Sequence, residues 1–204
     1  MLKIIFTELV KKYTTDDLLC KQLWNEVVIN YCDAGRYYHN LNHLEAIIGE
    51  LSDVRDRIPQ WDTALFSVFY HDIVYNALRS DNEAQSADKA QMRLHEMGFP
   101  KDQTTQCVLQ ILATKGHEPG NDLTTQLFID ADLAILGKAP KKYTEYSENL
   151  RKEFFVYTDS EYKAGRKKVL KYFLAMDRIF KSEHFYNKYE RQARINIEAE
   201  LNSL

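Results

Sequence analysis

Residues that interrupt helices are scarce in this chain, and no segment shows the alternation that marks a β-strand. Only seven glycines and four prolines occur in 204 residues. Long stretches instead repeat apolar side chains every three or four residues, which is the spacing of one face of an α-helix. No run of alternating β-branched residues stands between hairpin turns. The sequence therefore predicts an all-α fold built as a helical bundle.

Capping and breaking residues place the expected helices. A first helix is expected at the N-terminus, and a second runs from the caps Asp16 and Asp17 toward Gly35. Asp62 can cap the segment TALFSVFYHDIVY, which is apolar nearly all round and is expected to be a central, buried helix. Further helices are expected over roughly 40–58, 81–97, 102–114 and 122–137, followed by three amphipathic helices after Pro140.

Size and composition favour one folded domain over residues 1–204, since no linker, repeat or low-complexity tract marks a boundary. The chain is long enough to bury a core without a structural metal, so a bound metal is free to be catalytic. The formal charge of −3 provides no general cationic field, and binding to a nucleic acid duplex is not expected. The oligomeric state, including a homodimer, is left open.

The compartment is expected to be a reducing cytoplasm. Cys20, Cys32 and Cys107 are odd in number and contain no CxxC pair, which argues against a disulfide framework and a thiolate zinc site. Charged residues interrupt the apolar N-terminus before it reaches signal-peptide length. No segment approaches the roughly 18 uninterrupted apolar residues of a membrane span, so no membrane partner is expected.

Two of the six histidines, His39 and His43, stand four residues apart at the start of an apolar-periodic run. Side chains with this spacing on a helix share one face, with Cβ atoms about 5–6 Å apart, so both can reach one site. Such a pair alone is more often two ordinary histidines than a metal or catalytic site. Its interpretation therefore depends on other ligands.

Carboxylates in apolar surroundings supply those other ligands. His71-Asp72 ends the central apolar helix, and Asp130 and Asp132 stand within the apolar segment FIDADLAIL. Buried, ionised carboxylates need a compensating cation, and one metal ion can supply it for either aspartate of the later segment. The other either caps a backbone segment or supports the ligands. The mixed nitrogen and oxygen set suits Zn²⁺, Mn²⁺, Fe²⁺ or Mg²⁺, as one ion or two.

The order of these residues resembles the HD-domain superfamily of metal-dependent phosphohydrolases, an all-α fold named after its His-Asp dipeptide. The segment YHNLNH is also similar to the HN-x-x-H element of cyclic nucleotide phosphodiesterases, although this chain is shorter than those enzymes. From RYYHNLNHL through HDIVYN, DNEAQSA and DADLAILG, the chain looks like a bacterial subgroup of predicted HD-superfamily phosphohydrolases.

The resemblance implies a role for each motif residue. His39 corresponds to the general acid, while His43, His71, Asp72 and Asp132 correspond to metal ligands. Asp72 would bridge the ions if two metals bind, which also makes it a catalytic residue. A metal-activated water attacks phosphorus in this chemistry, and the acid protonates the leaving oxygen.

Four further residues are candidates near the site, each with an ordinary alternative. Arg36 and Lys115 can contact a substrate phosphate or be solvated charges. His117 can bind a second metal or a phosphate oxygen, or be a loop histidine. Glu83 can orient a metal-bound water, or simply stabilise the positive end of its helix.

The predicted function is hydrolysis of a phosphate ester of a small molecule, with a nucleotide as the first choice. An alternative is a non-catalytic HD fold that binds a ligand or regulates, with the metal only bracing the helices. The presence of His39 favours the enzyme, because a structural metal site needs no acid. A third interpretation, diiron oxygenase chemistry, requires more histidine ligands, of which His117 can provide one.

Overall fold

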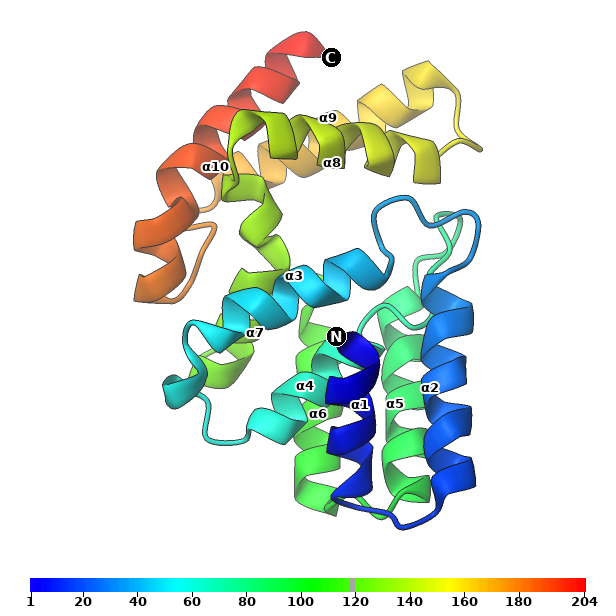
Figure 1. The fold of residues 1–204 in the computed structure, drawn as a ribbon. Helices are drawn as coiled ribbons and strands as arrows, with labels where there is room; N and C mark the ends of the chain where they lie inside the picture. The colour runs from blue at the N-terminus through cyan, green and yellow to red at the C-terminus, as the bar shows by residue number, and fades with distance from the viewer. Residues whose placement is uncertain (118–119) are drawn as a thin grey trace. The chain divides into compact units, whose positions relative to one another are not determined.

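The fold is all-α, as the sequence predicts. The computed structural model describes residues 1–117 and 120–204, and these contain ten α-helices, two short 3-10 helices and no β-strand (Figure 1). Within these residues no helix is both long enough and apolar enough to cross a bilayer.

The chain forms two compact units, Met1–Ile129 and Asp130–Leu204, with the division inside helix α7. The first unit contains α1 (Leu2–Lys11), α2 (Asp17–Tyr31), α3 (Leu41–Ser52), η1 (Arg55–Arg57), α4 (Trp61–Tyr70), α5 (Asn82–Glu96), α6 (Lys101–Ala113) and the beginning of α7 (Leu123–Leu133). The second contains the end of α7, η2 (Ala134–Gly137), α8 (Pro140–Glu153), α9 (Asp159–Ala175) and α10 (Glu183–Ser203). A single domain over 1–204 stays a prediction, because compactness alone does not test it.

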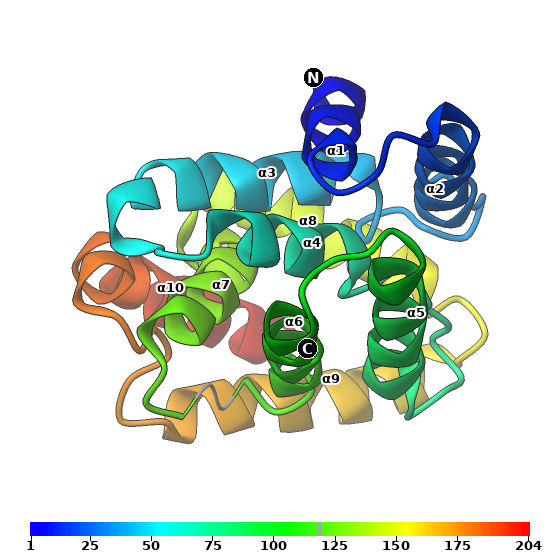
Figure 2. The same cartoon turned by 90° about the horizontal axis from the view of Figure 1, so that it is seen from below.

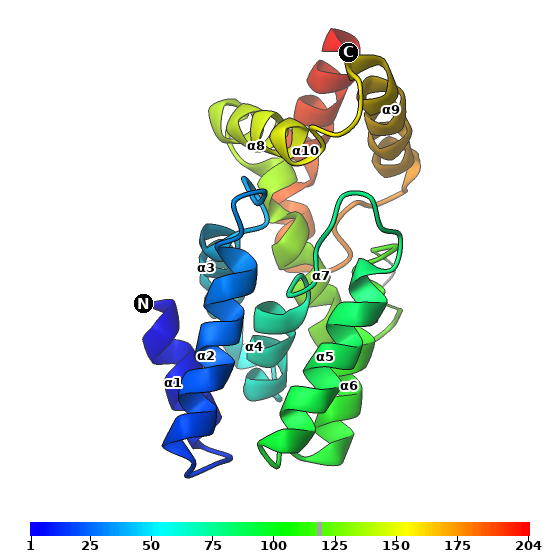
Figure 3. The same ribbon diagram turned by 90° about the vertical axis from the view of Figure 1, so that its right-hand side faces the viewer.

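Helix α4 is the centre of the first unit, as its apolar sequence predicts. Every residue from Thr63 to Tyr70 is buried. Helix α3 lies beside it (Figure 2), and α5 and α6, which lie side by side in Figure 3, also contact it. The ring of Phe69 meets Phe6 of α1 edge to face with centroids 4.8 Å apart. A helix surrounded in this way has a well-determined position, and so do the residues that follow its last turn.

Several helices begin or end at other residues than the sequence suggests. Asp16 does cap α2, accepting hydrogen bonds from the backbone N–H groups of Leu18 and Leu19. Helix α3 ends at Ser52, well before Pro59, and a 3-10 turn fills the interval. Helix α4 ends at Tyr70, so that the HDIVY segment is not helical.

Asp62 does not cap α4, because it lies inside the first turn and binds another helix end. Its carboxylate accepts hydrogen bonds from Lys12 Nζ at 2.7 Å and from the Tyr13 hydroxyl at 2.8 Å. Burial and this carboxylate together raise the pKa of Tyr13 to about 12. The interaction fastens the end of α1 to the start of α4.

The second unit is held by a buried ion pair that joins three helices. Arg166 of α9 donates two hydrogen bonds to the carboxylate of Glu200 on α10, at 2.8 and 2.9 Å. Ser147 and Tyr143 of α8 donate to the same carboxylate. The side chains of the pair are only 5% and 8% exposed. Burial raises the pKa of Glu200, but its bonds to Arg166 outweigh this effect, and the net pKa is lowered.

Glu200→Gln should destabilise the protein by about 3–5 kcal/mol, because it leaves the Arg166 guanidinium buried without its counter-charge. Urea unfolding measures this loss. Because the folded-state pKa of Glu200 lies below its unfolded value, the advantage of the wild type should be complete above pH ~4.3 and decrease as the pH falls. Glu145→Gln, which breaks an exposed pair with Lys142, should cost under about 1 kcal/mol. Equal costs for both variants would contradict the role of the buried pair.

Gly137 allows η2 to approach α10 closely. A Cβ atom built on it would lie 2.5 Å from Cβ of Tyr189 and 2.8 Å from its backbone oxygen. Gly137→Ala should therefore destabilise the protein by about 1–3 kcal/mol or more, because backbone atoms must move. Gly165 of α9 has open space around it, and Gly165→Ala should stabilise by about 0.5–1 kcal/mol. Denaturant midpoints that move in the same direction for both would be inconsistent with the close approach.

Candidate metal centre

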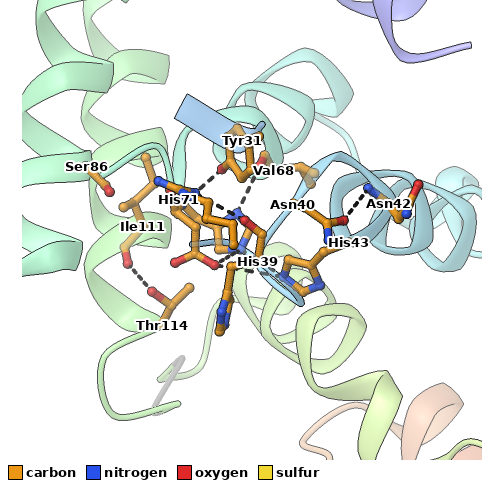
Figure 4. A network of polar contacts seen from close by, with 12 residues as sticks. Tyr31, His39, Asn40, Asn42, His43, Val68, His71, Ser86, Ile111 and Thr114 are labelled. Carbon is orange, nitrogen blue, oxygen red and sulfur yellow. Dashed lines mark hydrogen bonds and ion pairs between the residues drawn. The ribbon is translucent and has the colours of Figure 1, made fainter. Parts of the chain in front are cut away.

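The His-Asp dipeptide directly follows the central helix. The backbone N–H of His71 still donates to the Ser67 carbonyl at 2.9 Å, so the residue completes the last turn of α4. Its side chain is 1% exposed, whereas that of Asp72 is 17% exposed. The backbone N–H of Asp72 donates to the hydroxyl of Tyr31, a fully buried residue of α2. The end of one buried helix thus positions both side chains, and Figure 4 shows His71 near Tyr31 and Val68.

A backbone hydrogen bond sets the orientation of the His71 ring. Its Nδ1 lies 2.9 Å from the carbonyl oxygen of Val68, an atom that can only accept. Nδ1 must therefore carry the proton in this contact, and in the neutral ring the lone pair is on Nε2. A histidine oriented in this way is ready to bind a metal through Nε2.

Three potential ligand atoms meet next to that lone pair. Nε2 of His71 lies 3.3 Å from Nε2 of His43 and 3.0 Å from Oδ2 of Asp72, and the third side of the triangle measures 3.9 Å. Two ligands bound to one zinc ion at about 2.1 Å and a tetrahedral angle are about 3.4 Å apart. The triangle therefore has the size that one divalent ion requires.

Asp132 is the fourth predicted ligand. It stands on α7, one turn after Phe128, whose ring meets that of His71 with centroids 5.8 Å apart. Asp132 itself belongs to the second compact unit, and its role as a metal ligand stays a prediction. The two histidines are buried and the aspartate is half-buried. Three of the four predicted ligands, His43, His71 and Asp72, therefore lie at metal-binding distances from one another.

The electrostatics of the site favour an ionised Asp72. Burial raises the pKa of its carboxyl group, but the neighbouring His71, His39 and His43 outweigh this effect and hold the pKa well below the ordinary range. The carboxylate is therefore negative at neutral pH. A negative oxygen and two imidazole nitrogens form the mixed donor set that Zn²⁺, Mn²⁺ and Fe²⁺ accept.

His39 lies beside the cluster, although not for the reason that its spacing suggests. Helix α3 begins at Leu41, after the cap Asn40, so His39 belongs to the preceding loop and not to the helical face of His43. The two imidazole centroids are nevertheless 5.7 Å apart. The ring of His39 also meets Tyr75, at 4.2 Å and an interplanar angle of 30°, and Tyr38, at 4.9 Å and 79°. It is half-buried and therefore still accessible.

Arg36 lies next to His39 and Asp72, and its guanidinium donates hydrogen bonds to the protein backbone. Its Nη1 donates to the carbonyl of Asp72 at 2.6 Å and to that of His39 at 3.3 Å, and Nη2 donates to Ile73 at 3.1 Å. The guanidinium is thus committed to three carbonyl groups. A contact with substrate phosphate stays a prediction for this residue.

The other candidates lie on loops and helix ends. Lys115 is exposed, and its Nζ donates to the Ser80 carbonyl at 2.8 Å. His117, half-buried, has a φ of 53°, a left-handed conformation that is uncommon for histidine. Glu83 is half-buried in the first turn of α5. Their suggested roles toward substrate or water stay predictions.

Asp130 has the capping role that was one of its two interpretations. Its carboxylate accepts hydrogen bonds from the backbone N–H groups of Lys181 and Ser182, at 2.8 and 2.7 Å, and from the Ser182 hydroxyl. Burial raises its pKa, and these bonds only partly compensate. All these partners belong to the start of α10. None of its described contacts involves a histidine.

Sequence patterns did not single out the tyrosines of the site. Tyr31, Tyr38 and Tyr75 contact Asp72, His39, His43 or Arg36, but aromatic residues at helical spacing are usually core residues. Their nearness in the sequence to predicted site residues could have indicated two of them: Tyr38 directly precedes His39, and Tyr75 follows Asp72 by three residues.

Comparisons of the chain with protein-family models, with curated proteins and with solved structures find no match. The resemblance to the HD-domain superfamily therefore rests on the motifs alone and stays a prediction.

Asp72→Asn should weaken the binding of Mn²⁺ or Zn²⁺ by more than about 100-fold, because changes to groups that merely support ligands already cost 10–100-fold. Isothermal titration of metal-free protein and elemental analysis measure the loss. Asp62→Asn, at the other end of α4, is the control and should bind metal as the wild type does. Unchanged affinity in Asp72→Asn would exclude this residue as a ligand.

Proposed function

We propose that this protein is a metal-dependent phosphohydrolase that cleaves a phosphate ester of a nucleotide or another small molecule. The observation that carries the proposal is the triangle of His43 Nε2, His71 Nε2 and Asp72 Oδ2, next to a further accessible imidazole. A site that only braced helices would have no use for that additional histidine.

The proposed metal ligands are His43, His71, Asp72 and Asp132. A divalent ion held by them would activate water near neutral pH and neutralise charge on the phosphoryl oxygens. The protein must supply the remaining step, which is protonation of the leaving oxygen. His39 is the proposed acid, since the protonated imidazole carries an N–H that can be donated to the leaving oxygen.

The order of the motifs supports the same proposal. The segments YHNLNH and HD and the ADL aspartate follow the arrangement of the HD-domain superfamily, whose members hydrolyse phosphate esters with bound metal. The observed all-α fold agrees with this assignment, although many unrelated families share the same fold class.

Elemental analysis followed by a substrate panel tests the proposal. The purified protein should contain or acquire one or two divalent ions and hydrolyse at least one ester among nucleoside phosphates and simple alkyl and aryl phosphates. Mn²⁺, Mg²⁺, Zn²⁺ and Fe²⁺ should each be supplied. Protein that binds metal but hydrolyses none of these esters would support a non-catalytic binding module instead, and protein that binds no metal would exclude both.

His39→Ala should keep its metal but lose about 10²–10⁴-fold in kcat on esters with a poor leaving group, because their leaving oxygen needs a proton. On 4-nitrophenyl phosphate, whose leaving group is stable as an anion, the loss should be much smaller. His95→Ala removes an exposed histidine of α5 and serves as the control. If His39→Ala lost rate equally on both kinds of ester, the residue would not be the acid.

A further inference from the structure

Arg36 connects two segments that are far apart in the sequence. Its hydrogen bonds reach the carbonyl of His39, in the loop before α3, and the carbonyls of Asp72 and Ile73, in the turn after α4. The donors of a guanidinium form a planar fork of fixed shape, so these acceptors fix the distance between the two backbones. A lysine ammonium also has three donors, but it lacks their planar arrangement.

Two tyrosines enclose the same guanidinium. The Arg36 Cζ lies 4.9 Å from the ring centroid of Tyr31 and 5.5 Å from that of Tyr75. Tyr31 is fully buried and its hydroxyl accepts the Asp72 N–H. Cation–π contacts of this kind stabilise a cation that has lost part of its hydration. The side chain is therefore held in place and is poorly suited to follow a mobile phosphate group.

The ring of Tyr75 continues this chain of contacts to His39. The two rings are inclined by 30° with centroids 4.2 Å apart, which is a close, tilted ring contact. The residue stands three positions after Asp72, in a turn whose backbone Arg36 holds. The metal-ligand segment and the imidazole of His39 are thus joined through one guanidinium and one phenol ring.

We propose that Arg36 and Tyr75 are positioning residues, which hold the His39 imidazole at a fixed place relative to the His71-Asp72 turn. This inference rests on the proposed function, because it assigns these contacts to the orientation of the general acid. Neither side chain is in the proposed ligand set, so the metal should be unaffected by their loss. A displacement of about 1 Å of a reacting group can cost roughly 100-fold in rate.

Tyr75→Leu tests the ring contact. Its metal content and KM should equal those of the wild type, while kcat on an alkyl phosphate should fall about 10–100-fold and kcat on 4-nitrophenyl phosphate much less. Tyr75→Phe keeps the ring and should recover most of the loss. Equal rates for Leu, Phe and wild type on the alkyl ester would overturn the assignment.

Arg36→Lys separates positioning from phosphate binding. It keeps the positive charge but loses the planar fork. As a positioning residue, Arg36 should repeat the pattern of Tyr75→Leu, with lowered kcat on the alkyl ester and unchanged KM. A raised KM with an unchanged kcat on both esters would identify it as a phosphate contact and overturn the proposal for this residue.

A spectroscopic measurement tests the arrangement without any turnover. In metal-free protein labelled at histidine, the His39 Cε1–H signal, assigned by its absence in His39→Gln, should be shifted by the Tyr75 ring and should move in Tyr75→Leu but not in Tyr75→Phe. An unmoved signal in Tyr75→Leu would overturn the inference even in an active enzyme. If every ester is inert but the signal moves, the proposed function fails while the contact itself stands.

Discussion

The negative charge of Asp72, held between two imidazoles at the end of a buried helix, is the constraint on which the rest of the site depends. A carboxylate with little access to water is stable only beside compensating groups. The hydrogen bond to the Val68 carbonyl orients His71 so that its Nε2 lies 3.0 Å from Oδ2 of Asp72. Nε2 of His43 lies 3.9 Å from the same oxygen. Two protonated imidazoles would also compensate the carboxylate, but their Nε2 atoms are only 3.3 Å apart and would repel each other. One dication could be bound by all three ligand atoms at once, which is why we propose a metal here.

The fold serves this constraint through helix α4. Its residues Thr63–Tyr70 are all buried, and the helix ends at Tyr70, directly before the His71-Asp72 dipeptide, so that His71 has a well-determined position. The two loop segments near the site are not held by a helix in this way. The loop of His39 and the turn after Asp72 contain no regular helix, and Arg36 and Tyr75 provide cross-links between them. The proposed ligand His71 is thus held by packing, whereas the proposed acid is held by directed polar and aromatic contacts.

Much of the fold is local information and could be predicted from the sequence, but the contacts between segments could not. The helical period, the Asp16 cap and the burial of α4 follow from neighbouring residues. The end of α3 at Ser52 and the pairing of Asp62 with Lys12 depend on tertiary packing. For the site, residue types indicated which side chains can bind a metal. Arg36 contacts Asp72 and Ile73, which follow it by 36 and 37 positions, and no periodic pattern of the sequence predicts contacts at such a separation.

Asp130 and Asp132 show why the same reasoning could not decide between two neighbouring carboxylates. Both interrupt one apolar segment, and each needs a partner for its charge. On a helix, residues two apart point about 200° away from each other, so the two side chains cannot share one site. The carboxylate of Asp130 accepts hydrogen bonds from the backbone N–H groups of Lys181 and Ser182, just before α10, and these contacts need no metal. For Asp132 the role of metal ligand stays a prediction. The contacts of Asp130 could not be predicted from the sequence, because they depend on where residues 181 and 182 lie in space.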